Sequence, residues 1–284
     1  MMQIHPLAQV DSMADVDATA VVSAFCVVEF GVRIGPGTVL GPHCHILAGS
    51  VIGSGCEIHT GAVIGNTPQD RAFTGQASGV EIGDGTVIRE HVTIHRGTAP
   101  GSITRVGMRC LLMAGSHVGH NCVVEDDVTL VNGALLGGYV HVGAQAVPSG
   151  HVAVHQFVRI GEGAMIGIAS RITQDVLPFF MISGAGFNVG INRIGLRRMG
   201  ASHSEIDEAR RAFHVICHER HSLPVVKKLL EAELVTRIGL AIILFLASNS
   251  RRGFHLHGTD YLRISDTSHL STTSPDNEEK NVDL

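Results

Sequence analysis

The sequence predicts a mainly β protein: a parallel β-helix of hexapeptide repeats, followed by a small α-helical domain. Three observations predict this class. An aliphatic residue recurs every six positions, glycine is abundant while aromatic residues are few, and the pattern becomes helical after about residue 204. The 284 residues include 34 Gly, 10 Phe, 2 Tyr and no Trp. A core without large rings must consist of small aliphatic side chains, and glycine allows many tight turns.

The six-residue period covers most of the first two thirds of the chain. From Val10 to Ile172, every sixth position gives 28 sites, and 24 of them carry Val, Ile or Leu; the others are Asp70, Gln76, Pro100 and Pro148. Neither a helix nor simple strand alternation produces this period. A β-helix does, because each hexapeptide supplies one short strand and one turn, and three hexapeptides close a coil of about 18 residues. The aliphatic residue and the residue two before it then point inward.

Two interruptions of the period are expected to be loops that leave the coil. They cover residues 65–81 ("GNTPQDRAFTGQASGVE") and 95–105 ("HRGTAPGSITR"), and both are rich in polar residues. Long loops on a rigid repeat scaffold commonly carry function. We therefore expect the functional site close to them.

The remaining chain predicts two further regions. The β-helix is expected over residues 1–182, and a connection with a C-terminal α-helical domain over 183–264. Ser204 is the expected N-cap of a first long helix, and the segments 223–235 and 236–253 predict two more. The polar residues 265–284 are expected to be disordered.

Composition excludes several classes of function. A net charge of −5 argues against a general nucleic-acid binder. The longest apolar run, 238–247, is about half of what a transmembrane helix needs. The six cysteines form no C-x-x-C pair, and the N-terminus lacks the features of a signal peptide. These observations predict an intracellular protein with reduced cysteines and no transmembrane segment.

Two histidines three residues apart, His117 and His120, pose the main functional question. On a helix they would share one face, but Val118 is an inward position of the six-residue period, so both histidines point away from the coil interior. Positions 18 residues apart should stack on neighbouring coils, roughly 4.8 Å apart. His120 should therefore stack with Gly138 and Gln156. A base, a backbone N–H and an amide at one corner suit acyl transfer.

A metal site and a cysteine nucleophile are the alternatives at this corner. The γ-class carbonic anhydrases, which are also hexapeptide proteins, bind metal through three histidines, but the sequence lacks a second pair at their wider spacing. Cys122 lies two residues before Val124, at an inward position, and is expected to be a small core residue. We expect neither a metal nor another cofactor.

Longer motifs resemble one family of hexapeptide enzymes. They are "IGNTPQDRAFTGQASGVEIGDGTVIREHVTIHRGT" (64–98), "HVGHNC" (117–122), "VHQF" (154–157), "GINRIGLRRMG" (190–200), "IHPLAQV" (4–10) and "FLASNSRRG" (245–253). Together they resemble the acyl carrier protein–UDP-N-acetylglucosamine O-acyltransferases of lipid A biosynthesis, over roughly residues 4–253. The resemblance implies a left-handed β-helix, a cytoplasmic homotrimer with active sites between subunits, and helices that help to dock acyl carrier protein.

The resemblance also assigns roles to single residues. His120 would be the general base that deprotonates the glucosamine 3-hydroxyl, and the Gly138 N–H would stabilise the oxyanion as an (R)-3-hydroxyacyl group leaves its carrier-protein thioester. Histidine suits the role of base because imidazole titrates near neutral pH. Six positions resemble substrate contacts: Asp70, His95, His117, His155, Gln156 and Arg198. Arg198 matches an arginine that meets the nucleotide phosphate, for which a guanidinium is well suited.

The chain departs from the family pattern at four places. Ala72 stands where the family usually has Lys, with Arg71 beside it. Tyr139 stands where a histidine is common, and Asn121 where an aspartate often follows the base. Ile168 occupies a position that tunes acyl length in the family, often with glycine, and its bulk is expected to shorten the acyl pocket.

Two other functions remain open from the sequence. The first is a related hexapeptide acyltransferase that acylates an amino-sugar nitrogen or uses acetyl-CoA. The N-acyltransferases normally carry an extra N-terminal domain, whereas the period here starts at Val10. The second is a non-catalytic β-helix, a possibility that Ala72 and Tyr139 keep open.

Overall fold

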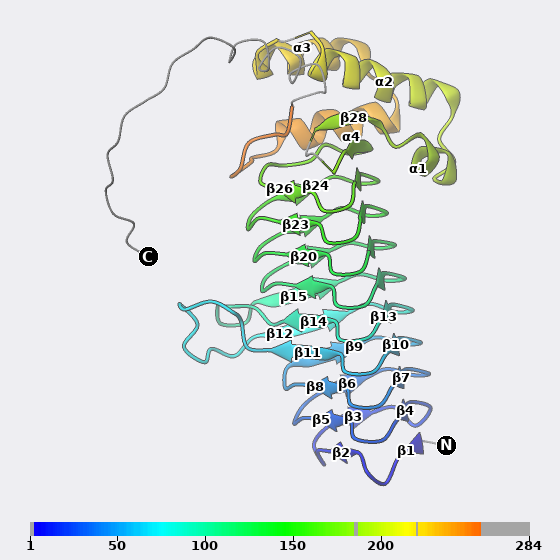
Figure 1. Cartoon of the computed structure of the whole chain (residues 1–284), viewed down its shortest axis with the longest axis vertical. Helices are drawn as coiled ribbons and strands as arrows, with labels where there is room; N and C mark the ends of the chain where they lie inside the picture. Colours follow the sequence, from blue (N-terminus) through cyan, green and yellow to red (C-terminus); the bar gives the residue numbers. More distant parts are fainter. Residues whose placement is uncertain (1–2, 185–186, 220, 257–284) are drawn as a thin grey trace, which may run out of the picture.

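A computed structural model describes residues 3–184, 187–219 and 221–256. The chain winds into a long column of short parallel strands, and helices cover the C-terminal end of that column (Figure 1). Four sheets form the three faces of the column, and two of them follow each other along the first face. The architecture is a left-handed parallel β-helix. The expected fold class is confirmed. The residues 265–284 that were expected to be disordered lie outside the described residues.

Each coil contributes one strand to each face. The first face contains β1 (Gln3–Ile4), β4 (Val21–Val22), β7 (Val39–Leu40), β10 (Glu57–Ile58), β13 (Val87–Ile88), β16 (Leu111–Leu112) and β19 (Thr129–Leu130). It continues with β22 (Val147–Pro148), β25 (Met165–Ile166), β27 (Phe180–Ile182) and the antiparallel β28 (Asn188–Ile191).

The second face contains β2 (Gln9–Val10), β5 (Val27–Val28), β8 (His45–Ile46), β11 (Val63–Asn66), β14 (Thr93–His95), β17 (His117–Val118), β20 (Leu135–Leu136), β23 (Ala153–Val154) and β26 (Arg171–Ile172). The third contains β3 (Asp15–Val16), β6 (Arg33–Ile34), β9 (Ser50–Ile52), β12 (Gly79–Ile82), β15 (Ile103–Val106), β18 (Val123–Val124), β21 (His141–Val142) and β24 (Arg159–Ile160).

Register along the column follows the six-residue period. Val118 pairs with Leu136, and Leu136 with Val154, at the expected spacing of 18 (136 − 118 and 154 − 136). Across the two loops the spacing grows to 30 between Ile64 and Ile94, and to 24 between Ile94 and Val118. The inserted lengths are multiples of six, which is why the aliphatic period continues in phase after each loop.

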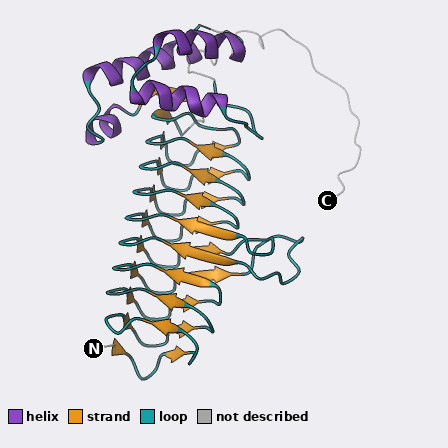
Figure 2. Cartoon of the chain, turned by 180° about the vertical axis from the view of Figure 1, so that it is seen from behind, coloured by secondary structure: helices purple, strands orange, loops and turns teal. Residues whose placement is uncertain are grey.

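Both loops are shorter than the sequence predicted, because β11, β12 and β15 each extend to four residues. The loops therefore cover 67–78 and 96–102, and they project together from one side of the column (Figure 2). They bind each other: the Gly101 N–H donates to the Ala77 carbonyl at 2.7 Å, and the Ser78 hydroxyl donates to the Gly97 carbonyl at 2.6 Å.

The interior of the column is aliphatic, as expected. The inward residues of consecutive coils pack into one buried cluster, and cysteines fill several positions two residues before an aliphatic one. The Cys122 thiol donates to the Gly137 carbonyl at 3.1 Å, and burial raises the pKa of this thiol to about 12. A thiol held neutral in the core is no nucleophile.

Among the described residues, four helices follow the coils: α1 (Arg193–Arg198), α2 (His203–Cys217), α3 (Leu223–Glu233) and α4 (Arg237–Ala247). The expected N-cap of α2, Ser204, is wrong. Ser202 caps the helix, because its hydroxyl accepts from the Glu205 N–H while the Glu205 carboxylate accepts from the Ser202 N–H. This reciprocal pair satisfies two donors at once, whereas Ser204 lies inside the first turn.

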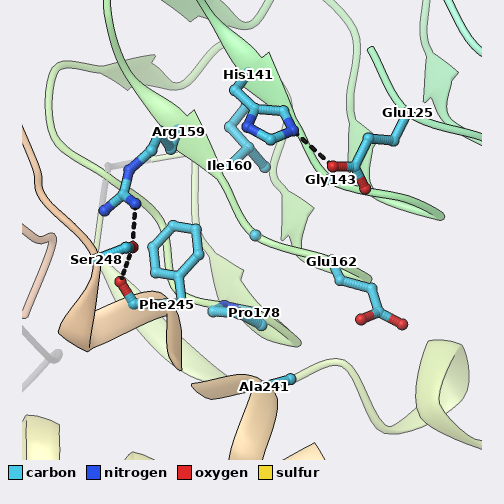
Figure 3. A pocket seen from close by; sticks show the side chains of 11 residues that line it. Glu125, His141, Gly143, Arg159, Ile160, Glu162, Pro178, Ala241, Phe245 and Ser248 are labelled. Atoms are coloured by element: carbon cyan, nitrogen blue, oxygen red, sulfur yellow. Dashed lines mark hydrogen bonds and ion pairs between the residues drawn. The ribbon is translucent and has the colours of Figure 1, made fainter. Parts of the chain in front are cut away.

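Arg159 on β24 fixes the helices to the coil (Figure 3). Its Nε donates to the fully buried Asp175 carboxylate at 2.7 Å, and it also hydrogen-bonds the Ser248 hydroxyl after α4. The guanidinium lies 4.4 Å from the centre of the Phe245 ring. Next to this contact is a cavity of 290 Å³, whose far wall carries an ion pair between Glu125 and His141 at 2.6 Å. The helices are thus anchored on the third face.

Candidate active site

The expected stack of His120, Gly138 and Gln156 forms at the corner that follows the second-face strands. The register of β17, β20 and β23 places the three residues on consecutive coils. The His120 ring lies directly over Gly138, where a Cβ atom would collide with its Cε1 and Nε2 atoms. Only glycine leaves room for the ring at this place. Among the described residues, none accepts a hydrogen bond from the Gly138 N–H.

Asn121 fixes the protonation site of His120. The Asn121 Oδ1 lies 3.0 Å from His120 Nδ1 and accepts the Thr98 N–H at 3.0 Å and the Thr98 hydroxyl at 2.9 Å. A backbone N–H can only donate, so the amide oxygen must face Thr98. The same oxygen faces Nδ1, which must therefore carry the proton. His120 Nε2 is left with a free lone pair, as a general base requires.

The first loop covers this base. Asp70 places a carboxylate oxygen 3.8 Å from His120 Nε2, while its other oxygen accepts the Ala72 N–H at 2.9 Å and holds the turn. His120 points away from the coil interior, as expected, but only 5% of its surface is exposed. The loop and Tyr139 enclose it. Arg71, next to Ala72, is exposed.

His95 on the preceding coil and His117 on β17, the strand that leads to His120, line the same site. Their rings are 5.1 Å apart, and His117 Nδ1 lies 2.8 Å from the Thr93 hydroxyl. Burial, reinforced by the neighbouring His95 and His120, lowers the pKa of His117 to about 4. Burial also lowers the pKa of His95, whose Nδ1 lies 2.5 Å from the Thr67 carbonyl. Both rings are therefore neutral near pH 7 and offer hydrogen bonds rather than charge.

His155 and Gln156 lie on the coil after Gly138 and are exposed. The chain beyond α4 returns to hold them: Arg252 donates to the Gln156 carbonyl at 2.8 Å and to His155 Nδ1 at 2.5 Å. Because arginine only donates, His155 must accept at Nδ1, and its Nε2 carries the proton. His155 thus offers an N–H donor at Nε2.

Arg198 and Ile168 do not share the corner of His120. Arg198 is exposed at the end of α1 and lines a groove of 860 Å³ with Met165 and Met181 of the first face. In a three-faced column, the first face lies opposite the corner between the second and third faces. Ile168, 65% exposed, follows β25 and lies at the other edge of the second face. Within one chain, Arg198 cannot join the His120 site.

Three contacts at the site were not predicted from the sequence. Thr98 orients Asn121, the Tyr139 hydroxyl lies 2.9 Å from the Thr98 hydroxyl, and Arg252 holds His155. Thr98 lies in the motif "HRGT" and Arg252 in the motif "NSRRG". Each is a polar residue without an assigned role inside a family motif, and this feature could have identified them as site residues.

Two negative findings concern the described residues. No group of three or more His, Cys, Asp or Glu side chains in 3–184, 187–219 and 221–256 is arranged to hold a metal ion. Over the same ranges, no helix has the length and apolar character to cross a membrane.

Comparison with known proteins finds related families in two regions of the chain. The C-terminal region, residues 175–255, matches the family model described as UDP-N-acetylglucosamine O-acyltransferase, domain 2, and residues 31–66 match the bacterial transferase hexapeptide model. An acyl-[acyl-carrier-protein]–UDP-N-acetylglucosamine O-acyltransferase of Gloeothece citriformis is 41% identical over 58% of the chain and 60% of its own length. One of Thiobacillus denitrificans is 33% identical over 66% of the chain and 73% of its own length.

A solved structure extends the match over nearly the whole chain. The UDP-N-acetylglucosamine acyltransferase of Francisella novicida superposes with a TM-score of 0.87 at 32% identity, and the match covers 95% of this chain and all of the Francisella chain. The sequence match to the Gloeothece protein, in contrast, covers only 60% of that relative's length. The fold, the paired loops and these matches together show that the chain belongs to the acyl-[acyl-carrier-protein]–UDP-N-acetylglucosamine O-acyltransferase family.

Proposed function

We propose that the protein transfers an (R)-3-hydroxyacyl group from acyl carrier protein to the 3-hydroxyl of UDP-N-acetylglucosamine, the first step of lipid A biosynthesis. The observation that carries this proposal is the single corner at which the free Nε2 of His120 and the unpaired N–H of Gly138 meet beneath the Asp70 loop. Family membership supports the choice of acyl donor and sugar nucleotide.

The residues at the corner account for each bond of the transfer. His120 Nε2 removes the proton from the sugar hydroxyl as its oxygen attacks the thioester carbonyl. The Gly138 N–H stabilises the resulting oxyanion, a contribution of about 3 kcal/mol for a well-placed donor. Collapse of the intermediate breaks the carbon–sulfur bond, and the imidazolium returns its proton to the carrier-protein thiolate. No metal or other resident cofactor takes part in these steps.

The surrounding polar residues suit a sugar nucleotide. The carboxylate of Asp70 lies in front of the base, where a sugar hydroxyl would approach it. The neutral rings of His95 and His117 offer uncharged hydrogen-bonding groups beside it. His155 and Gln156 extend the polar surface toward the helices. These are the proposed substrate contacts.

The proposed active unit is a homotrimer with each site between two subunits. The position of Arg198 supports it: the arginine lies on the face opposite His120, so it can meet a nucleotide phosphate at that corner only from a second copy. Closed rings of identical subunits place the same two surfaces at every interface. Sedimentation should give three times the 30.1 kDa mass of the chain. The mass of a monomer would contradict this arrangement.

The acyl carrier protein is proposed to dock at the helical domain, and the reaction to take place in the cytoplasm. Ile168 is proposed to limit the length of the acyl chain, because its exposed side chain lies at the far edge of the face that begins next to His120. Ile168→Gly should move the preference toward longer acyl donors, with Arg171→Ala on the neighbouring strand as the control. An unchanged preference would remove Ile168 from the pocket.

One assay tests the proposed function directly. Wild-type protein is incubated with UDP-N-acetylglucosamine and (R)-3-hydroxyacyl carrier proteins of graded length. The expected product is an ester at the 3-oxygen, which alkaline hydroxylamine cleaves. An amide product that resists hydroxylamine, or transfer from acetyl-CoA, would instead identify a related acyltransferase. Absence of transfer with every donor would indicate a non-catalytic β-helix.

A further inference from the structure

Two of the four departures from the family pattern, Asn121 and Tyr139, lie at the corner of His120. Tyr139 follows Gly138 at the corner with a φ of 59°, and its ring stands edge-on to the His120 ring at 5.3 Å. On its other side the ring stacks on Phe157 at 4.9 Å. Asn121, Tyr139 and Phe157 occupy the same left-handed corner position on consecutive coils. Tyr139 is therefore held in place from two sides.

The hydroxyl of Tyr139 connects this ring to the base through other side chains. It lies 2.9 Å from the Thr98 hydroxyl, and the Thr98 hydroxyl proton is already donated to Asn121 Oδ1. A threonine hydroxyl has one proton, so the Tyr139 O–H must be the donor toward Thr98. The chain of hydrogen bonds has a fixed direction: Tyr139 donates to Thr98, Thr98 donates to Asn121, and Asn121 accepts from His120.

Asn121 needs this support because its amide is neutral and free to rotate by itself. With the side-chain –NH₂ turned toward His120, Nδ1 would have to accept, and the proton would move to Nε2. A histidine in that tautomer cannot take a proton from the sugar hydroxyl. The second loop prevents this rotation through Thr98, and Tyr139 ties Thr98 to the coil. A carboxylate at position 121 would need no such support, since both of its oxygens accept.

We propose that Tyr139 is a positioning residue for the reaction: through Thr98 and Asn121 it holds His120 in the tautomer with a free Nε2. The inference rests on the proposed acyl transfer and deepens it. The uncharged, hydrogen-bonded side chains of Tyr139, Thr98 and Asn121 orient His120. A carboxylate beside the base would otherwise have this role. Tyr139 is thus a compensating partner of Asn121 rather than a sign of lost activity.

Paired substitutions test the chain through kinetics. Tyr139→Phe removes only the hydroxyl, and Thr98→Val removes the link between that hydroxyl and Asn121. Each should lower kcat roughly three- to tenfold with KM changed less than about twofold, because the loss affects orientation of the base. Thr98→Ser keeps the hydroxyl and should restore most of kcat.

The double variant supplies the decisive comparison. Residues that act through one chain are not additive, so Tyr139→Phe with Thr98→Val should be no slower than Thr98→Val by itself. Losses that multiply would overturn the proposal, as would a Tyr139→Phe enzyme with wild-type kcat.

A spectroscopic readout tests the same chain without catalysis. In protein labelled with ¹⁵N-histidine, the His120 resonances are identified by their loss in His120→Ala. They should show the proton on Nδ1 in the wild type, and a mixture of tautomers in Tyr139→Phe and Thr98→Val. An unchanged spectrum in both variants would refute the positioning role. Inactive wild-type protein would instead refute the proposed function. The histidine spectra would still show whether Tyr139 holds the tautomer of His120.

Discussion

The interior of the column and its proposed catalytic corner differ in what they require of a side chain, although both repeat every 18 residues. Inside, Val118, Leu136 and Val154 are aliphatic residues that differ little in kind and form one buried stack. At the corner, His120, Gly138 and Gln156 occupy equivalent positions but have three different chemistries. The interior needs volume and apolar character, whereas each corner position needs one particular group.

Because of this difference, neighbouring residues of one coil should contribute either to stability or to activity. A corner residue points away from the core, so its replacement should remove chemistry and leave the coil intact. An inward residue touches no substrate, so its replacement should destabilise the coil. The following substitutions are expected to break or sharpen that separation.

The largest effect is expected for His120→Ala. Loss of a general base typically costs between about 10² and 10⁴ in rate, and we expect roughly 10³ in kcat with an unchanged melting temperature. His151 provides the matched control, because it is an exposed histidine at another corner with a φ of 54°. His151→Ala should keep wild-type kcat. Equal losses in the two variants would deny His120 a special role.

The interior should show the opposite behaviour. Leu136 is fully buried between Val118 and Val154, so Leu136→Ala leaves a cavity and should lower the free energy of unfolding by roughly 3 kcal/mol. Chemical denaturation measures this loss, and kcat below the transition should stay close to wild type. A folded Leu136→Ala protein whose kcat fell a hundredfold would contradict the proposed separation of stability from activity.

Gly138→Ala should lower kcat by about 10² while the fold persists. The added methyl group occupies the place of the His120 ring, and displacement of the base and of the N–H impairs both functions of the corner. Gly150→Ala is the control, because a Cβ there meets no atom closer than 3.5 Å. If Gly138→Ala kept full activity, the close approach of His120 to Gly138 would be irrelevant to catalysis.

The smallest effect concerns pH and His117. Burial holds its pKa at about 4 in the folded chain, below the ordinary value near 6.5 of an unfolded chain. Between these values the unfolded chain binds more protons, so stability falls as the pH drops from about 6.5 toward 4. His117→Asn should flatten the curve of unfolding free energy against pH by on the order of 1 kcal/mol. A parallel curve would contradict the half-buried, neutral state of His117.

The six-residue period predicted the column because it records the inward side chains, and their register is fixed by packing. It placed His120 over Gly138 for the same reason. The period does not describe the loops. It therefore could not predict that Asp70 covers His120 or that Thr98 contacts Asn121. Nor does it describe how the helices return, which determines the contact of Arg252 with His155. The sequence predicted Ser204 as the N-cap, whereas Ser202 caps the helix, because a two-residue shift of a helix start leaves little trace in a sequence.

The proposed site needs Arg198 from a second copy of the chain. Each of His120→Ala and Arg198→Ala should be impaired by itself, roughly 10³-fold and 10- to 100-fold. The most direct test is the transfer rate of an equimolar mixture of the two variants, unfolded and refolded together so that the subunits exchange. Random assembly pairs an intact His120 with an intact Arg198 at about one site in four, and the mixture should regain about a quarter of wild-type activity. A mixture no faster than the average of its two components would contradict a site shared between subunits.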